Sequence, residues 1–184
     1  MDDKGILELY AARSSQAAQE AREAYGPYCQ AIAENILGSE GEAEACVSGV
    51  WDAAQEQFAL RPPAILSAAL GKITRRLALK RWSSSGGRRT GGEVLPVLAE
   101  LEECVPSEGT GAPAEEGRLT DALAAFLRSK PMLQRMVFIR RYWYFNSVKV
   151  ISRQLSLPEA RVESLLRQLR QELRIYLEKE GISL

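Results

Sequence analysis

Residues 39–58 carry a complete amphipathic helix pattern. Ser39 and Glu42 have the spacing of a capping box, in which the serine oxygen accepts one backbone N–H and the glutamate reaches back to another. Apolar residues then recur every three or four positions, which places them on one face of a helix. They are Ala43, Cys46, Val47, Val50, Trp51, Ala54 and Phe58. The segment predicts a helix with one buried face, and similar patterns along the rest of the chain predict an all-α fold.

Proline and glycine set the expected ends of the first helices. We expect one helix over residues 6–24 and a second over residues 28–37, because Gly26 and Pro27 interrupt the pattern between them. The run Arg61-Pro62-Pro63 ends the third helix, since proline lacks an N–H and disfavours helical backbone at the residue before it.

A fourth helix follows this break. Its predicted buried stripe is Leu66, Leu70, Ile73 and Leu77. Residues 83–92 are rich in glycine and serine, and they predict a loop that carries Arg88 and Arg89. We therefore expect the first small helical domain to span residues 1–92.

An acidic segment that contains prolines separates this domain from the rest of the chain. Its stretch PSEGTGAPAEEG has no period that could bury a face. We predict a flexible acidic linker over residues 93–118 and a second helical domain over residues 119–184. The alternative left open is a short helix within residues 95–103 that packs on the first domain.

The second domain is expected to end in two helices joined by a tight turn. The first is capped by Asn146 or Ser147, and the second opens at Pro158 after Leu155-Ser156-Leu157. This is the pattern of a helix-turn-helix. The core face of its second helix is Val162, Leu165, Leu166, Leu169, Leu173 and Leu177. The aromatic run over residues 142–145, just before this motif, favours a small hydrophobic core over a base-stacking surface.

The formal net charge is zero, but the charges are segregated along the chain. Residues 1–60 hold 3 basic and 11 acidic side chains, whereas residues 61–92 hold 8 basic and no acidic ones. Residues 93–121 hold 1 basic and 8 acidic side chains, and residues 122–184 hold 12 basic and 5 acidic ones. Two basic and two acidic surfaces are therefore expected, and nucleic acid is the natural partner of the basic pair.

Several classes of function lack their usual residues in this sequence. Cys29, Cys46 and Cys104 are widely spaced and the chain has no histidine, so we expect free thiols and no metal site. Without a phosphate-binding glycine loop or paired carboxylates in an apolar setting, we expect no enzyme and no cofactor. No apolar run approaches the roughly 18 residues of a membrane span, and no secretory signal is recognisable, so we expect a cytoplasmic protein without membrane contact.

Taken in order, these parts resemble the sigma-70 family of RNA polymerase sigma factors, in its short extracytoplasmic-function-like type with sigma domains 2 and 4. The stretch YGPYCQAIAENILGSEGEAEACVSGVW is similar to the region that binds polymerase, and GKITRRLALKRW to the helix that reads and opens the minus 10 element. Residues 132–182 are similar to the domain that reads the minus 35 element. The resemblance covers nearly the whole chain. It implies core RNA polymerase and promoter DNA as partners, and it leaves an anti-sigma factor open as a third.

The expected contacts of the first domain follow from this resemblance and from the charges. The resemblance implies a polymerase-binding set on the third helix: Glu44, Ser48, Trp51 and Asp52. The stretch without acids supplies the expected DNA contacts, which are Lys72, Arg75, Arg76, Lys80, Arg81 and Trp82. Trp51 also belongs to the predicted core stripe, and Trp82 either stacks on bases or packs, of which packing is the more common.

In the second domain the base-reading residues are expected on the outward face of the last helix. They are Arg161, Glu163, Ser164, Arg167 and Gln168. Arginine can bind guanine with two hydrogen bonds, and glutamine can do the same with adenine. Glu163 either accepts from a cytosine amino group or pairs with Arg167, and we favour the pair. Arg170 and Arg174 are expected to add general charge. Ser156 replaces the glycine of the family's turn, so a left-handed backbone there would cost stability.

Two other functions stay open at this point. Ala45, Ser48 and Glu163 depart from the family pattern, and they favour a polymerase-independent helix-turn-helix DNA-binding regulator of transcription as the alternative. A third possibility is an adaptor that binds only proteins, which would show no salt-dependent affinity for any duplex.

Overall fold

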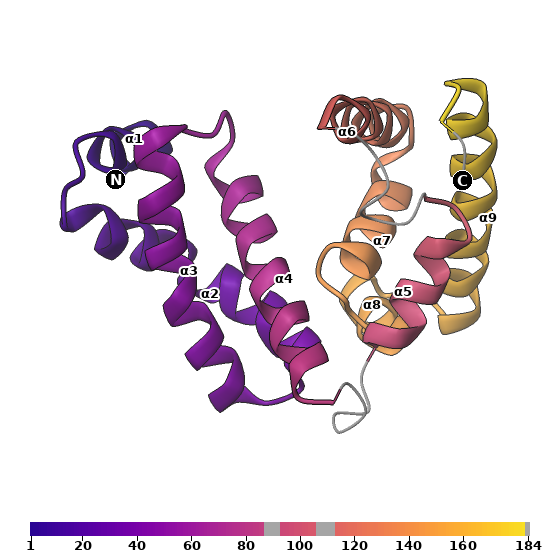
Figure 1. The fold of residues 1–184 in the computed structure, drawn as a ribbon. Helices are drawn as coiled ribbons and strands as arrows, with labels where there is room; N and C mark the ends of the chain where they lie inside the picture. The colour runs from indigo at the N-terminus through magenta and orange to yellow at the C-terminus, as the bar shows by residue number, and fades with distance from the viewer. Residues whose placement is uncertain (87–92, 106–112, 183–184) are drawn as a thin grey trace. The chain divides into compact units, whose positions relative to one another are not determined.

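The computed structural model describes residues 1–86, 93–105 and 113–182. Within these ranges it contains nine helices and no strand, which confirms the predicted all-α fold (Figure 1). The chain divides into two compact units, Met1–Gly92 and Glu93–Leu184. The predicted loop residues Arg88 and Arg89 lie outside the described ranges. None of the described helices is long and apolar enough to cross a membrane.

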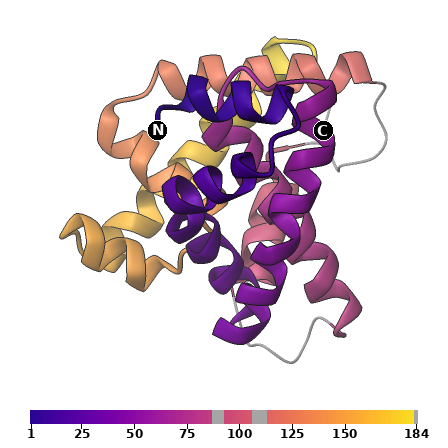
Figure 2. The ribbon, with the colours of Figure 1, turned by 90° about the vertical axis from the view of Figure 1, so that its left-hand side faces the viewer.

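The first unit is built around its second helix. Its elements are α1 (Asp3–Ala11), α2 (Gln16–Leu37), α3 (Glu40–Leu60) and α4 (Leu66–Ser84). Helix α2 packs against the other three, and α3 also packs against α4 (Figure 1, Figure 2). Cys29 and Cys46 are buried free thiols in this core.

Helix α3 forms as its pattern predicts. The Ser39 hydroxyl accepts a hydrogen bond from the backbone N–H of Glu42 at 3.5 Å, which is the expected cap of its first turn. All seven residues of the predicted apolar face are buried. Trp51 is only 2% exposed, so its ring belongs to the core of the first unit.

The predicted break at Gly26 and Pro27 is wrong. The chain breaks earlier, after α1, where Arg13 adopts a left-handed backbone with φ of 52°, and α2 then runs without interruption through Pro27. Proline inside a helix costs about 3 kcal/mol. The helix continues because one face of α2 is buried both before and after Pro27, and the free energy gained by this burial outweighs the cost of the proline. The residues of that face include Ala17, Ala21, Cys29 and Ile32.

The predicted stripe of α4 is correct except at Leu77. Leu66, Leu70 and Ile73 are buried, but Leu77 is only half-buried. The remaining buried positions of α4 are the smaller Gly71, Thr74 and Ala78. Small side chains let neighbouring helix backbones approach closely, and α4 has its main contacts with α2 and α3. The Thr74 hydroxyl is satisfied by donating to the Leu70 carbonyl at 2.8 Å.

The second unit is arranged around its long last helix. Its elements are α5 (Val94–Glu102), α6 (Pro113–Arg128), α7 (Met132–Tyr142), α8 (Val148–Leu155) and α9 (Glu159–Lys179). Helix α9 packs against α6, α7 and α8, and all six residues of its predicted core face are buried. The aromatic run contributes to this core, because Tyr142 and Phe145 are buried while Trp143 and Tyr144 are half-buried.

The predicted linker over residues 93–118 is wrong wherever the structure describes it. Helix α5 lies inside it, packs on α7 and belongs to the second unit, whereas the alternative had assigned such a helix to the first domain. Val94, Val97 and Cys104 are buried there. Helix α6 also begins within the predicted linker, at Pro113. Residues 106–112 lie outside the described ranges. The acidic composition suggested a solvated tether, but Glu93 and Glu100 both pair with Arg141 of the same unit.

Helices α8 and α9 are joined by three residues, Ser156 to Pro158. Of the two residues expected to cap α8, Ser147 is the one that does so, because its hydroxyl accepts a hydrogen bond from the backbone N–H of Val150 at 3.2 Å. Ser156 takes the left-handed conformation, with φ of 53° and ψ of 44°. An L-residue pays a steric penalty in that region, because its Cβ crowds the following carbonyl oxygen.

Replacing Ser156 with glycine should therefore stabilise the second unit by about 0.5–1 kcal/mol, the steric relief less the backbone entropy that glycine adds to the unfolded chain. Urea unfolding measures the gain. Ser156→Ala is the matched control, because it removes the hydroxyl but keeps the Cβ, and it should give no stabilisation. Equal stability of the two variants would contradict the steric explanation.

Candidate nucleic-acid interface

The first half of α9 presents a polar face opposite its row of leucines. Every residue predicted to read bases is exposed there: Arg161, Glu163, Ser164, Arg167 and Gln168. The turn before α9 is fixed to α8, because the Ser152 hydroxyl donates to the Leu157 carbonyl at 2.5 Å. The face thus combines guanidinium, hydroxyl and carboxamide groups, which can all bind base edges, on a helix whose preceding turn is hydrogen-bonded to α8.

The pair expected between Glu163 and Arg167 does not form. No ion pair links the two side chains in the part of the chain that the structure describes, although they stand four residues apart on α9. Both side chains are exposed. Solvation explains this, since an exposed pair at this spacing gains only about 0.3–0.5 kcal/mol.

Helix α4 carries the predicted cations of the first unit. Lys72, Arg76 and Lys80 follow one another at intervals of four residues and are exposed, so they form one row along the helix. Arg81 is exposed beside this row and Arg75 is half-buried.

Trp82 closes α4 as a half-buried side chain. Its indole Nε1 is buried and has no hydrogen-bond partner among the residues that the structure describes. The polar edge of the ring therefore faces protein rather than solvent, and this favours packing over base stacking at this position.

The residues expected to bind polymerase separate into two groups. Glu44, Ser48 and Asp52 are exposed at intervals of four residues and form one polar row on α3. Trp51 faces the other way, into the core. A partner that docks on this row would meet two carboxylates and a hydroxyl, without the indole ring.

Sequence reasoning missed an ion network that holds α5 in the second unit. Its centre is Arg141, which is 3% exposed. Its Nη2 and Nε donate to the two carboxylate oxygens of Glu100 at 2.6 and 3.2 Å. Its Nη1 donates to Glu93 Oε2 at 2.5 Å and to the Asn146 carbonyl at 3.0 Å. A buried guanidinium with this many acceptors is well satisfied.

Arg170 of α9 extends the same network. Its Nη1 donates to Glu100 Oε2 at 3.3 Å and to the Tyr142 hydroxyl at 3.1 Å, and its Nε donates to Glu103 Oε2 at 3.1 Å. The Tyr142 hydroxyl in turn donates to Glu100 Oε2 at 2.9 Å. We call these six residues the α5 clamp: Glu93, Glu100, Glu103, Arg141, Tyr142 and Arg170. Arg170 was expected to add general charge, but α5 covers it, and its side chain is 17% exposed.

Glu100 is the carboxylate that the clamp shares between two arginines. Burial alone would raise its pKa, but hydrogen bonds from Arg141 and Tyr142 and the charges of Arg141 and Arg170 outweigh burial and lower it. The ionised form is therefore more favourable in the folded chain than in the unfolded one.

Acid should weaken the second unit through this residue. Because the folded pKa of Glu100 is lowered, its contribution to the free energy of unfolding is complete above the ordinary pKa of 4.5 and is lost as the pH falls through the folded value. Urea unfolding of the wild type and of Glu100→Gln, repeated at pH values above and below the ordinary pKa, measures the contribution of Glu100 to the free energy of unfolding. The stability difference between the two should shrink below about pH 4.5, and a difference that does not change with pH would contradict the clamp.

The described surfaces are thus the outward face of α9, the cation row of α4 and the polar row of α3. A scan against models of protein families finds no match for this chain, and a search of curated proteins finds no significant match.

Proposed function

We propose that this chain is a sigma factor of the sigma-70 type, which binds core RNA polymerase and directs it to promoters in the cytoplasm. The observation that carries the proposal is the exposed polar face of α9, a helix that follows α8 after a turn of three residues. The function requires no catalytic group, metal or cofactor from the chain itself.

In this proposal the second unit binds the minus 35 element through α8 and α9. The start of α9 enters the major groove, where Arg167 and Gln168 meet base edges. Each bidentate contact contributes roughly 1–3 kcal/mol of discrimination between bases. Lys149 and Arg153 are exposed on α8, the helix that crosses the DNA backbone in such motifs, and both suit phosphate contacts.

The first unit would hold the minus 10 element. Strand opening exposes bases and leaves a flexible backbone, which is bound by a positively charged surface. The row of Lys72, Arg76 and Lys80 provides that charge on one side of α4. The polar row of α3 is the proposed contact with core polymerase, and its two carboxylates require a partner surface that is basic or rich in hydrogen-bond donors.

Transcription from selected promoters tests the proposal. Promoter fragments are first enriched by binding to the complex of this chain with core polymerase, and run-off transcription is then measured on them. Arg167→Ala should reduce the product by roughly tenfold or more, since it removes a base contact. Arg128→Ala, an exposed arginine on α6, is the matched control and should leave the yield unchanged. Absence of any promoter-dependent product with the wild-type chain would overturn the proposal.

One observation favours a second candidate, a DNA-binding regulator that acts without polymerase. Interfaces are usually anchored by a few large side chains, above all tryptophan, tyrosine and arginine. The row of Glu44, Ser48 and Asp52 has no such anchor because Trp51 is buried. Co-purification separates the two functions: a tagged chain that retains DNA but not core polymerase is the regulator.

A further inference from the structure

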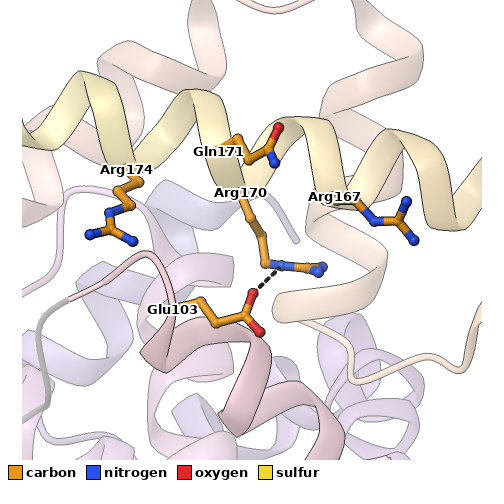
Figure 3. Close-up of a pocket in the computed structure, with 5 residues that line it drawn as sticks. All are labelled: Glu103, Arg167, Arg170, Gln171 and Arg174. Carbon is orange, nitrogen blue, oxygen red and sulfur yellow. Dashed lines mark hydrogen bonds and ion pairs between the residues drawn. The ribbon is translucent and has the colours of Figure 1, made fainter.

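A groove lies beside the middle of α9 in the second unit. Its volume is about 270 Å³. The lining residues are Glu103, Arg167, Arg170, Gln171 and Arg174. Figure 3 shows Arg170 reaching toward Glu103, with Arg167 and Arg174 on either side of it along α9. Three guanidinium groups and a single carboxylate therefore line the groove.

The groove continues the face of α9 that is proposed to read DNA. Arg167 belongs to both surfaces, and Arg170 and Arg174 follow it at intervals of three and four residues, which keeps them on one side of the helix. Arg174 pairs with Glu178 on its own helix at 3.2 Å. Arg167 has no carboxylate within ion-pair distance in the described part of the chain.

We propose that this groove binds a backbone phosphate of duplex DNA, and that Glu103 competes with this phosphate for Arg170. The inference rests on the proposed DNA binding by α9. Arginine recognises phosphate oxygens with parallel N–H donors, so Arg170 and Arg174 suit a phosphodiester, while Arg167 at the edge of the groove stays with its base contact. Glu103 takes the place that the phosphate needs at Arg170 Nε.

The exchange is feasible because the two carboxylates at Arg170 are held differently. The Glu103 side chain is 64% exposed, so its pair with Arg170 is screened by water and weak. Glu100 and Tyr142 hold Arg170 from the buried side and remain in place when Glu103 leaves. Arg170 is thus positioned before DNA arrives, and Glu103 lowers the affinity of the free chain for duplexes.

The test compares two neutralised glutamates of the same segment in the full chain. Glu103→Gln removes the competitor. Glu102→Gln changes the net charge equally, one residue away, at an exposed carboxylate that makes no ion pair in the described ranges. Binding to a fluorescent random-sequence duplex of about 30 base pairs is followed by anisotropy in about 50–200 mM NaCl.

Glu103→Gln should bind the duplex about 3–10-fold more tightly than the wild type at the lowest salt, because it frees one arginine for a phosphate. Its plot of log affinity against log salt should be steeper by about 0.9, the value of one added phosphate contact. Glu102→Gln should change the affinity by less than about twofold. Glu103→Asp, which keeps the charge but shortens its reach, should lie between Glu103→Gln and the wild type.

The outcomes separate the two proposals. If the wild type binds the duplex and the two glutamine variants behave alike, Glu103 is no competitor and this inference is overturned, while DNA binding stands. If neither the wild type nor any variant shows salt-dependent duplex binding, the proposed function fails together with the inference.

Discussion

Replacing Arg141 with methionine should lower the free energy of unfolding of the second unit by about 3–5 kcal/mol. The guanidinium is almost fully buried and holds two carboxylates, that of Glu93 just before α5 and that of Glu100 within it. Its removal leaves both carboxylates without their main partner, and Glu100 stays largely buried. Glu100 then keeps only the longer contact with Arg170 and the hydrogen bond from Tyr142, and a buried carboxylate with so much of its compensation removed costs far more than the loss of an exposed pair.

Urea unfolding together with hydrogen exchange of the α7 and α9 amides would measure this loss in the second unit. Arg140→Met is the matched control, since Arg140 is on the same helix and makes an exposed hydrogen bond to Gln154. It should cost less than about 1 kcal/mol. Adding Glu100→Leu to Arg141→Met should recover part of the loss, because it removes the buried carboxylate that has lost its main partner. Equal losses for the Arg141 and Arg140 variants would show that α5 is not anchored by the clamp.

Replacing Trp51 with alanine should destabilise the first unit by about 3–5 kcal/mol. The ring is buried on α3, and its loss leaves a cavity that neighbouring helices fill only in part. Any weakening of polymerase binding by this variant would follow from partial unfolding of the first unit. The triple change of Glu44, Ser48 and Asp52 to alanine should instead leave the fold intact and, under the proposed function, weaken polymerase binding.

Thermal unfolding of the first unit, combined with polymerase pull-down, distinguishes these effects. Asp52→Ala is the control for stability, because an exposed substitution on the same helix should stay within about 0.5 kcal/mol of the wild type. If Trp51→Ala kept wild-type stability and still lost polymerase, the indole would act as a direct contact and its assignment to the core would be wrong.

Placing α5 in the second unit changes how the acidic segment is understood. A tether would leave α9 uncovered, whereas the clamp covers Arg170 and sets Glu103 beside the arginines of the groove. Two neighbouring carboxylates are thus expected to have different effects: Glu100 stabilises the unit, and under the proposed function Glu103 lowers its affinity for DNA. Unfolding experiments measure the effect of Glu100 on stability, and duplex binding measures the effect of Glu103 on affinity.

The sequence by itself determined the features that depend on neighbours a few residues apart. The buried faces of α3 and α9 follow from a spacing of three to four residues. The Ser39 cap and the need for a cap at Asn146 or Ser147 follow from the first turn of each helix. The exposure of Arg161, Arg167 and Gln168 follows too, because a helix with a leucine face must present its other side chains outward.

Only the tertiary structure decided the features in which distant segments meet. Pro27 remains inside α2 because packing against other helices outweighs a local penalty that the sequence shows plainly. Glu100 meets Arg141 across 41 positions and Arg170 across 70 positions, and no period in the sequence encodes such a distance. A charge has no periodic signature of its own. Whether a glutamate is solvated or forms a buried ion pair depends on which cations the fold brings within hydrogen-bonding distance. In this chain Arg141 and Arg170 lie within that distance of Glu100, so a segment expected to be a linker is part of the second unit.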